Sequence, residues 1–285
     1  MLFPDHMSGS IKSILEMTAW RMDAPAMFGV FHILAAAAVT AASFWAARIL
    51  SVPAATGIAP VKANTRFDRI LAVTGWILII TEIYKQLFLY YIVNNGAYDW
   101  WFFPFQLCSV PMYLCILLPF TGGRLRDAFI TFMATYTFVS ASAALAFPED
   151  FLRSYVTLTA HGFLWHGILL FISLFILFSH QADLSHRGFA RAAVLFIMLS
   201  TAAIMINVLS ESRMTAAHDA HLIPNSFAAM FYLNPYHISP QPIIGTIQEM
   251  TCIPLGLALY ALAVTAAADL VCVCFGRFSR EKHLR

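Results

Sequence analysis

The segment PFQLCSVPMY, from Pro104 to Tyr113, places a thiol and two prolines within an apolar stretch of the chain. Thiolates are strong nucleophiles, so Cys108 is a candidate for covalent catalysis such as acyl transfer. Pro111 lacks an N–H and removes a backbone hydrogen bond from a helix that passes through it, so we expect an opened turn at 107–111. A free cysteine in an apolar segment is more often a packing residue. The spacing leaves catalysis and packing both open.

Two histidines occupy a second apolar segment, HGFLWHG, in which a glycine follows each of them. A thiol that transfers acyl groups needs a neighbouring base, and His161 and His166 are the candidates. They lie five residues apart, about 140° around a helix, so we expect one of them alone to face a given site. His166 is the first choice because it lies deeper in the segment, where neighbouring helices enclose it. A structural, hydrogen-bonded histidine is the alternative interpretation.

Polar side chains in other apolar segments complete the set of candidate binding residues. In TEIYKQ, Glu82 and Lys85 share one helix face and can neutralise one another. A charge inside a bilayer is costly, so this pair marks either a functional site or a structural contact between helices. The candidate substrate-binding residues are Gln106, Glu82, Lys85, Tyr113 and Asn207.

The remaining cysteines and histidines form no recognisable metal or disulfide pattern. The five cysteines are scattered, mostly within apolar stretches, which is not the spacing of a disulfide framework or of a zinc site. The sequence HDAH, from His218 to His221, has metal-like spacing but lacks a third ligand. The chain has no glycine-rich phosphate loop and no block of basic residues. We therefore expect no cofactor, no metal and no nucleic-acid partner.

The composition places these residues in a membrane protein. Of the 285 residues, 60% are hydrophobic and 11% are charged, whereas globular proteins average about 45–50% and about 25%. A helix needs about 20 apolar residues to cross a bilayer. Seven segments meet this need, the third being the shortest: 27–50, 69–93, 103–120, 128–147, 157–179, 190–210 and 251–275. The expected fold is all-α, a single integral membrane domain over 1–285 built as a seven-helix transmembrane bundle.

The basic residues give this bundle an orientation. Four of the 17 Lys and Arg residues flank one set of span ends, and twelve flank the other, namely Arg48, Lys62, Arg66, Arg69, Arg124, Arg126, Arg187, Arg191, Arg277, Arg280, Lys282 and Arg285. Basic residues favour the cytoplasmic side, so we expect the N-terminus outside and the C-terminus inside. On this orientation Cys108, both histidines and Asn207 lie in the outer halves of their spans.

Two outer segments flank the predicted bundle. Within residues 1–26, SILEMTAWRM has apolar residues at helical spacing and predicts a short helix on the membrane surface, with Ser13 and Glu16 as a capping box. The connection at 211–250 contains four prolines, yet it includes the apolar run FAAMFYL. We expect this connection to form a structured cap that dips partly into the membrane.

The motifs WWFFPFQLCSVPMYL, FMATY, TAHGFLWHG and FYLNPY resemble those of the YwaF-type integral membrane proteins of bacteria, a family similar to the animal transmembrane protein 164. The resemblance is most specific over PFQLCSVPMY. It implies a compact seven-helix fold in the bacterial plasma membrane and, through the animal relative, a cysteine-dependent enzyme that moves fatty acyl chains between phospholipids. It also implies Cys108 as the nucleophile and His166 or His161 as its partner; many relatives carry His where Gln106 stands.

Two functions from different classes follow. The first is a lipid acyltransferase or transacylase that uses Cys108 at the outer leaflet, with membrane phospholipids or lysolipids as its partners. The second is a small-molecule transporter or receptor in which Glu82 and Lys85 form an internal switch. Transporters are often built from inverted repeats, and this chain has one broken helix and no repeat, which favours the enzyme. An assembly factor without chemistry is the third interpretation.

Overall fold

The computed structural model describes residues 5–51, 65–219 and 227–283, and this part of the chain is helical with short connections. Its α-helices are α1 (Asp5–Glu16), α2 (Val30–Leu50), α3 (Thr65–Phe88), α4 (Val110–Leu117), α5 (Gly123–Ala146), α6 (Val156–Phe178), α7 (His186–Asp219), α8 (Pro242–Met250) and α9 (Ile253–His283). A π-helix, η1 (Leu89–Val93), and three 3₁₀ turns lie between them, namely η2 (Trp100–Phe102), η3 (Leu118–Phe120) and η4 (Met230–Tyr232). The predicted all-α fold is confirmed.

Six helices of the described residues are long and apolar enough to cross a membrane: α2, α3 with η1, α5, α6, α7 and α9. The predicted third span, 103–120, is wrong in its first half, because only Val110–Phe120 is helical there. At 1.5 Å per residue this helix covers about 16 Å, roughly half of a 30 Å bilayer core. The residues before it form an irregular loop that packs inside the protein.

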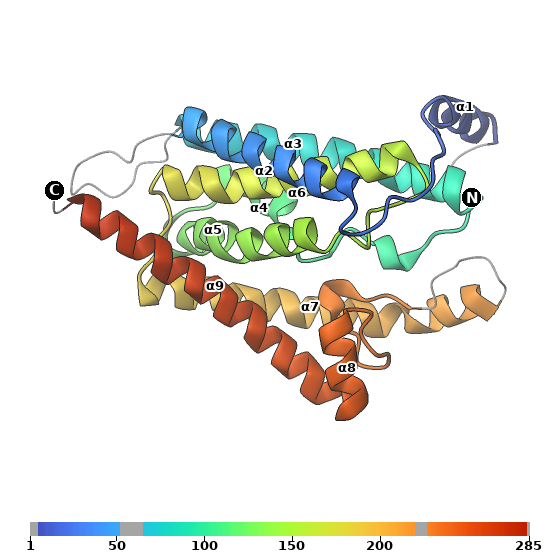
Figure 1. The fold of residues 1–285 in the computed structure, drawn as a ribbon. Helices are drawn as coiled ribbons and strands as arrows, with labels where there is room; N and C mark the ends of the chain where they lie inside the picture. Colours follow the sequence, from blue (N-terminus) through green and yellow to red (C-terminus); the bar gives the residue numbers. More distant parts are fainter. Residues whose placement is uncertain (1–4, 52–64, 220–226, 284–285) are drawn as a thin grey trace.

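Figure 1 shows the arrangement of these helices. α2, α3, α5 and α6 lie together, α7 runs along another side of α5, and α9 crosses the bundle obliquely. α1 and α8 lie at one end of the bundle, called the cap end here, and the C-terminal part of α9 lies at the opposite end. Seven passes through a membrane would separate the two ends of a chain in this way, and the number of passes stays a prediction because α4 is only half as long as a span. The outward direction of the cap end stays a prediction.

Close helix packing in the bundle depends on the glycine that follows His166. A Cβ at Gly167 would lie 2.4 Å from Val39 Cγ1, so only glycine allows α2 this close to α6. The Ser43 hydroxyl donates to the Gly167 carbonyl at 2.8 Å across the same contact. His32, also on α2, is buried with Nε2 2.9 Å from the carbonyl oxygen at position 145 of α5. These contacts tie α2 to the two central helices.

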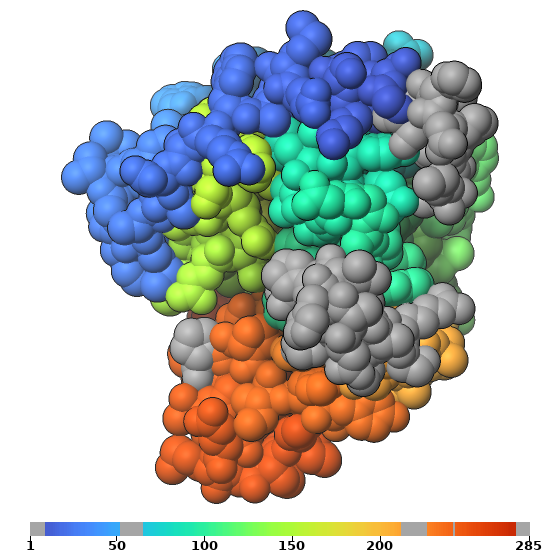
Figure 2. Space-filling model, turned by 90° about the vertical axis from the view of Figure 1, so that its right-hand side faces the viewer, coloured from blue at the N-terminus to red at the C-terminus, as the bar shows by residue number. Residues whose placement is uncertain are grey.

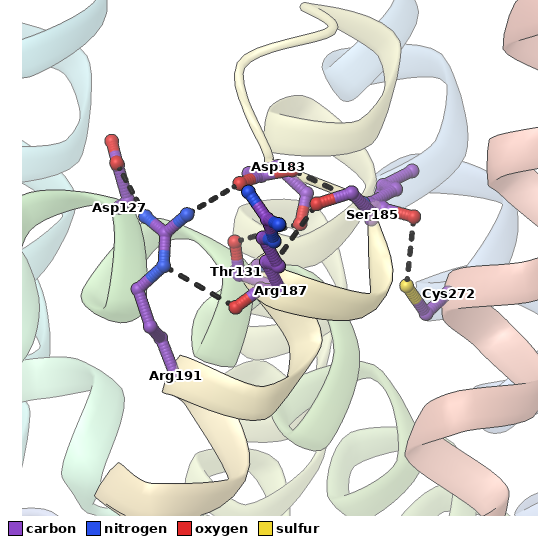
Figure 3. A network of polar contacts seen from close by, with 9 residues as sticks. Asp127, Thr131, Asp183, Ser185, Arg187, Arg191 and Cys272 are labelled. Carbon is purple, nitrogen blue, oxygen red and sulfur yellow. Dashed lines mark hydrogen bonds and ion pairs between the residues drawn. The ribbon is translucent and has the colours of Figure 1, made fainter. Parts of the chain in front are cut away.

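A polar network fixes the connection between α6 and α7 at the end opposite the cap end (Figure 3). Arg191 of α7 pairs with Asp127 Oδ2 at 2.7 Å and with Asp183 Oδ2 at 2.9 Å. The Thr131 hydroxyl of α5 donates to the Asp183 carbonyl, and the Cys272 thiol of α9 donates to the backbone of the connection. Four elements are thereby joined at this end, which holds the helices in place for the site at the other.

The predicted capping box at Ser13 is wrong, because α1 begins much earlier. The helix starts at Asp5, so Ser13 lies inside it, and its hydroxyl donates to the Gly9 carbonyl one turn before at 3.1 Å. A serine within a helix often makes this backbone bond. Glu16 is the last residue of α1 and not the third residue of a new helix.

The predicted cap at 211–250 is partly helix and partly a folded loop. α7 continues to Asp219, so the loop begins later than predicted, and His221 of the HDAH sequence lies outside the described residues. From residue 227 the chain returns to the bundle, where Phe231 is buried and its ring stacks on that of Phe105 with centroids 5.9 Å apart. In the view onto the cap end, this orange segment lies at one edge and α1 at the opposite one (Figure 2).

Candidate active site

A cavity of about 290 Å³ lies in the cap-end half of the bundle. Its wall comes from α3, residues 101–109, α5 and the loop after it, α6, the η4 loop and α9. Its polar side chains are those of Lys85, Gln106, Cys108, Ser109, Ser140, Asp150, His161, His166, Tyr232, Gln241 and Tyr260. The fold thus brings the predicted nucleophile, both predicted histidines, Lys85 and Gln106 around one space. Glu82, Tyr113 and Asn207 lie outside the lining.

Cys108 lies two residues before α4, in the irregular stretch that ends at Ser109. α4 begins at Val110 with Ser109 as its N-cap, and Pro111 stands in the first turn, where a missing N–H breaks no helical bond. The expected opened turn within a helix is therefore wrong, because the proline starts a helix instead. The Trp165 indole N–H donates to the Cys108 carbonyl at 3.2 Å and holds it against α6. The positive end of the α4 dipole favours negative charge beside Cys108.

His166 has the protonation pattern that a general base needs. Its Nδ1 lies 2.8 Å from the Gly162 carbonyl, which can only accept, so Nδ1 carries the proton of the neutral ring. Nε2 then keeps its lone pair. The ring stacks on Phe151 with centroids 4.9 Å apart. Phe151 fits there because position 162 has no side chain: a Cβ on Gly162 would lie 2.3 Å from the Phe151 Cβ.

His161 lines the same cavity, so the expectation that one histidine alone would face a site is wrong. The cavity covers a wide face of α6 that also includes Gly162 and Trp165, and the two histidines stand at its margins. The His161 ring stacks on Trp165 with centroids 5.4 Å apart. Its Nε2 is buried and has no hydrogen-bond partner among the described residues. Such a nitrogen is free to bind a ligand or a water molecule.

The predicted ion pair of α3 is confirmed. Lys85 Nζ lies 2.8 Å from Glu82 Oε1, and Gln86 Nε2 donates to the same oxygen at 2.7 Å. Glu82 is 4% exposed, and its second oxygen has no partner in the described part of the chain. Lys85 Nζ also lies 5.8 Å from the centre of the Trp165 ring, beside the cavity. The ammonium therefore faces the cavity, and the carboxylate lies behind it.

Gln106 and Asn207 hold the η4 loop over the cavity. Gln106 donates to the Ala229 carbonyl at 3.1 Å and accepts from the Phe231 N–H at 2.9 Å. Asn207 donates to the Met230 carbonyl at 3.1 Å and accepts from the Met230 N–H at 2.7 Å. Each amide replaces the backbone partners that a regular helix would supply. A role in substrate binding stays a prediction for both.

Three further cavity residues have no counterpart in the sequence analysis: Asp150, Tyr232 and Tyr260. The Tyr232 hydroxyl donates to Asp150 Oδ2, which joins the η4 loop to the loop after α5. Burial and this carboxylate raise the pKa of Tyr232, so its phenol stays protonated. In the sequence, the FYLNPY motif could have identified Tyr232 as a candidate site residue. Tyr113, predicted to bind substrate, donates its hydroxyl to the Pro104 carbonyl at 2.7 Å.

The arrangement suits nucleophilic covalent chemistry. A thiol at the start of a helix, a histidine with a free lone pair and neutral hydroxyl donors share one largely apolar space. Within the described residues, no three His, Cys, Asp or Glu side chains lie together as a metal site would require.

Comparison with known proteins gives one match. The model of the TMEM164 family matches residues 27–266, a range that contains the whole cavity wall. No curated protein and no solved structure matches the chain. The family match covers far more than half of the 285 residues and agrees with the resemblance seen in PFQLCSVPMY. The chain therefore belongs to the TMEM164 family.

Proposed function

We propose that this protein is a cysteine-dependent acyltransferase or transacylase of membrane lipids, working on phospholipid or lysolipid acyl chains. The observation that carries the proposal is that Cys108, His166 and apolar side chains line one and the same cavity. The bias of basic residues supports a cap end that faces outward, so the reaction belongs to the outer leaflet, in a bacterial plasma membrane.

In the first half-reaction His166 Nε2 takes the proton of the Cys108 thiol. The thiolate sulfur then attacks the carbonyl carbon of a lipid ester, and a tetrahedral oxyanion forms. When this intermediate collapses, the carbon–oxygen ester bond breaks and a carbon–sulfur thioester bond remains. The imidazolium returns its proton to the leaving alkoxide, which departs as the alcohol of a lysolipid.

The second half-reaction reverses these steps with a different alcohol. A lysolipid hydroxyl gives its proton to a histidine and attacks the thioester carbon, so the ester forms and the thiol is restored. The unpartnered Nε2 of His161 makes it a second candidate for this proton. Both half-reactions conserve one acyl group and one proton, and neither needs an oxidant, a reductant or a metal.

The oxyanion needs hydrogen-bond donors in a site that excludes water. The Gln106 amide has a second N–H beyond the one given to Ala229, and the hydroxyls of Ser109 and Tyr260 also line the cavity. One such donor is worth about 10²–10³ in rate in other enzymes. The Lys85 ammonium, held by Glu82, is the candidate partner for a lipid phosphate.

The same geometry argues against the alternative of a transporter or receptor. A transport path would have to continue to the end opposite the cap end. The cavity lining stops at Val139 on α5 and Val264 on α9. Beyond this depth the rings of Phe132, Tyr136 and Phe196 stack in the core, with centroids 5.1 Å and 4.7 Å apart.

A pair of cysteine variants tests the proposal. Cys108→Ser should abolish acyl transfer and leave folding intact, because the two side chains have nearly the same size. Cys115→Ser is the matched control and should keep activity, since Cys115 is fully buried with its sulfur 3.6 Å from that of Met133.

The measurement is the intact mass of the purified protein after incubation with phospholipid vesicles. An acyl adduct that hydroxylamine removes should form on the parent and on Cys115→Ser, and should be absent from Cys108→Ser. If Cys108→Ser transfers acyl chains at the parental rate, the thiol is a packing residue and the proposed function is wrong.

A further inference from the structure

The cavity has an apolar side that the chemistry at Cys108 does not require. Val139, Ala143 and Phe147 follow one another at intervals of four residues and form a stripe on α5. Residues of α9 complete this side. It is called the α5–α9 arm here and consists of Val139, Ala143, Ala144, Phe147, Tyr260 and Val264. Apart from the Tyr260 hydroxyl, these side chains offer hydrocarbon contacts alone. The hydroxyl of Ser140, which lines the cavity beside them, already donates to the Thr137 carbonyl at 3.1 Å.

The α5–α9 arm is closed on one side and borders the surface on the other. Just beyond Val139 the Tyr136 hydroxyl donates to the Thr265 hydroxyl at 3.4 Å and joins the two helices. From there toward the cap end, α9 leans away from α5, as its oblique course in Figure 1 shows. Phe147, at the cap end of α5, is 61% exposed. The arm therefore leads from the thiol toward the lipid-facing flank of the bundle.

We propose that a single acyl chain of a membrane lipid passes between α5 and α9 into this arm and thereby brings its ester carbonyl to Cys108. The identity of the reacting bond rests on the proposed function. The occupant follows from the surroundings: both helices are long and apolar enough to span a membrane, and Ala143 and Phe147 at the edge of the arm are exposed, so the arm borders bilayer hydrocarbon, whose chains match this lining.

The dimensions suit one chain. Val139 and Phe147 are separated by about 12 Å along a helix axis. The whole cavity of about 290 Å³ is at the lower limit of small-molecule sites, which measure about 300–1,000 Å³. The second chain and the part of the headgroup beyond its phosphate therefore stay outside, while the phosphate reaches Lys85 at the edge of the cavity. The cavity therefore selects among acyl chains by the shape of the carbons nearest the ester. At this place Ala143 leaves room that a larger residue would fill.

A second apolar groove on α5 supplies a matched control. It has a volume of about 890 Å³ and lies between α2, α5 and α6, with Ala37, Ala41 and Ala146 in its wall. Within the part of the chain that the structure describes, no cysteine, histidine or charged residue lines it. Ala146 thus lies on the same helix as Ala143 and has the same size, yet it faces a groove without a nucleophile. Ala146→Leu should leave acyl loading unchanged.

The first experiment locates the chain without relying on turnover. The protein in phosphatidylcholine vesicles is irradiated with a phosphatidylcholine that carries a diazirine in one acyl chain, and the labelled peptides are mapped. Label should appear on 139–147 and 260–264, and Ala143→Leu or Val264→Phe should lower it about tenfold, since overfilled sites bind about that much more weakly. Labelling of these peptides that neither substitution changes would overturn the proposal.

The second experiment compares chain lengths at Cys108. A two-carbon activated ester should acylate Ala143→Leu and Val264→Phe at the parental rate, whereas an 18-carbon phospholipid chain should load about tenfold more slowly. Equal loading of the long chain on both variants and the parent means that the arm is not the chain site, while the proposed function stands. If the parent carries label in the arm but forms no adduct on Cys108, the arm is the chain site and the proposed function is wrong.

Discussion

Substitution of Gly162 by alanine links the packing of α6 to the geometry of the site. The new Cβ would lie 2.3 Å from the Phe151 Cβ and 2.4 Å from its Cγ. A Cβ moves only with its backbone, so no rotation of the Phe151 ring relieves the contact. A separation of 3.4 Å requires the loop after α5 to retreat by about 1.1 Å. That loop carries Asp150 and supports the ring of His166.

The expected loss of stability is moderate and the loss of activity is large. Overpacking lowers the free energy of unfolding by about 1–3 kcal/mol, whereas the higher helix propensity of alanine over glycine raises it by up to about 1 kcal/mol. We therefore expect Gly162→Ala to lower the free energy of unfolding by about 1–2 kcal/mol. A misplacement of about 1 Å at a site can reduce the rate about 100-fold, so acyl transfer should fall much further than stability.

Thermal unfolding in detergent, followed by the reaction of the buried Cys115 with a fluorogenic thiol reagent in a background in which the exposed Cys252 and Cys274 are serine, measures the first effect. A loss of about 1–2 kcal/mol lowers the Tm by about 2–8 °C. Gly276→Ala is the control, because its Cβ would meet ordinary contacts at 3.5 Å and 3.6 Å, and it should be neutral or stabilising. Phe151→Gly should restore tolerance to Gly162→Ala, whereas Phe151→Ala, which keeps the Cβ, should not. Equal rescue by both would refute this reasoning.

Three other substitutions each remove the polar contacts of one side chain. Lys85→Met should cost about 3 kcal/mol in denaturant unfolding because Glu82 is left unpaired, and adding Glu82→Gln should recover most of it. Asn207→Ala should cost about 1–3 kcal/mol and speed proteolysis of the η4 loop, since it frees two buried backbone groups. Arg191→Ala should cost about 1 kcal/mol or less, and the difference in Tm should shrink at about 1 M salt, because Arg191 is partly exposed.

The transmembrane helices were predictable because apolar length determines them. The predicted 27–50 and 157–179 segments differ by a few residues from α2 and α6. The segment 103–120 failed because an apolar composition does not distinguish a helix from an irregular stretch buried in protein. Pro111 was wrongly predicted to break a helix, because its place in the first turn of α4 depends on the chain before it. A proline at that position starts a helix as readily as it interrupts one.

The candidate site was predictable only where chemistry and local pattern coincide. Cys108, His161 and His166 stand out as reactive groups in apolar segments, and all three line the cavity. Asp150 and Tyr260 do not stand out, since a carboxylate in a loop and a tyrosine in a span are common. They reach the cavity from parts of the chain that only the fold brings together.

The two irregular stretches of the bundle, the η4 loop and the chain before α4, stabilise one another. In the η4 loop, Phe231 and Tyr232 have φ values of 56° and 57°, a left-handed conformation that costs about 1–2 kcal/mol per residue. Four hydrogen bonds between the loop backbone and the side chains of Gln106 and Asn207, two donated by each side, offset this cost and satisfy backbone groups that would have no partner in hydrocarbon. Gln106 can make its pair because the chain before α4 is not helical.

The same irregular stretch puts Cys108 at the start of a half-length helix inside the membrane. In a full span, the backbone N–H groups beside a mid-membrane thiol are consumed by the helix, and the positive end of the dipole lies at the membrane surface. Here α4 begins at Val110, so its positive end stands at the depth of the cavity. The N–H groups of Ser109 and Val110 donate to the Gln106 carbonyl, so it is the dipole of the helix, and not an unbonded N–H, that acts beside Cys108. The amide of Gln106 therefore has a positioning role whatever else it binds: it holds the η4 loop against the stretch that delivers the thiol.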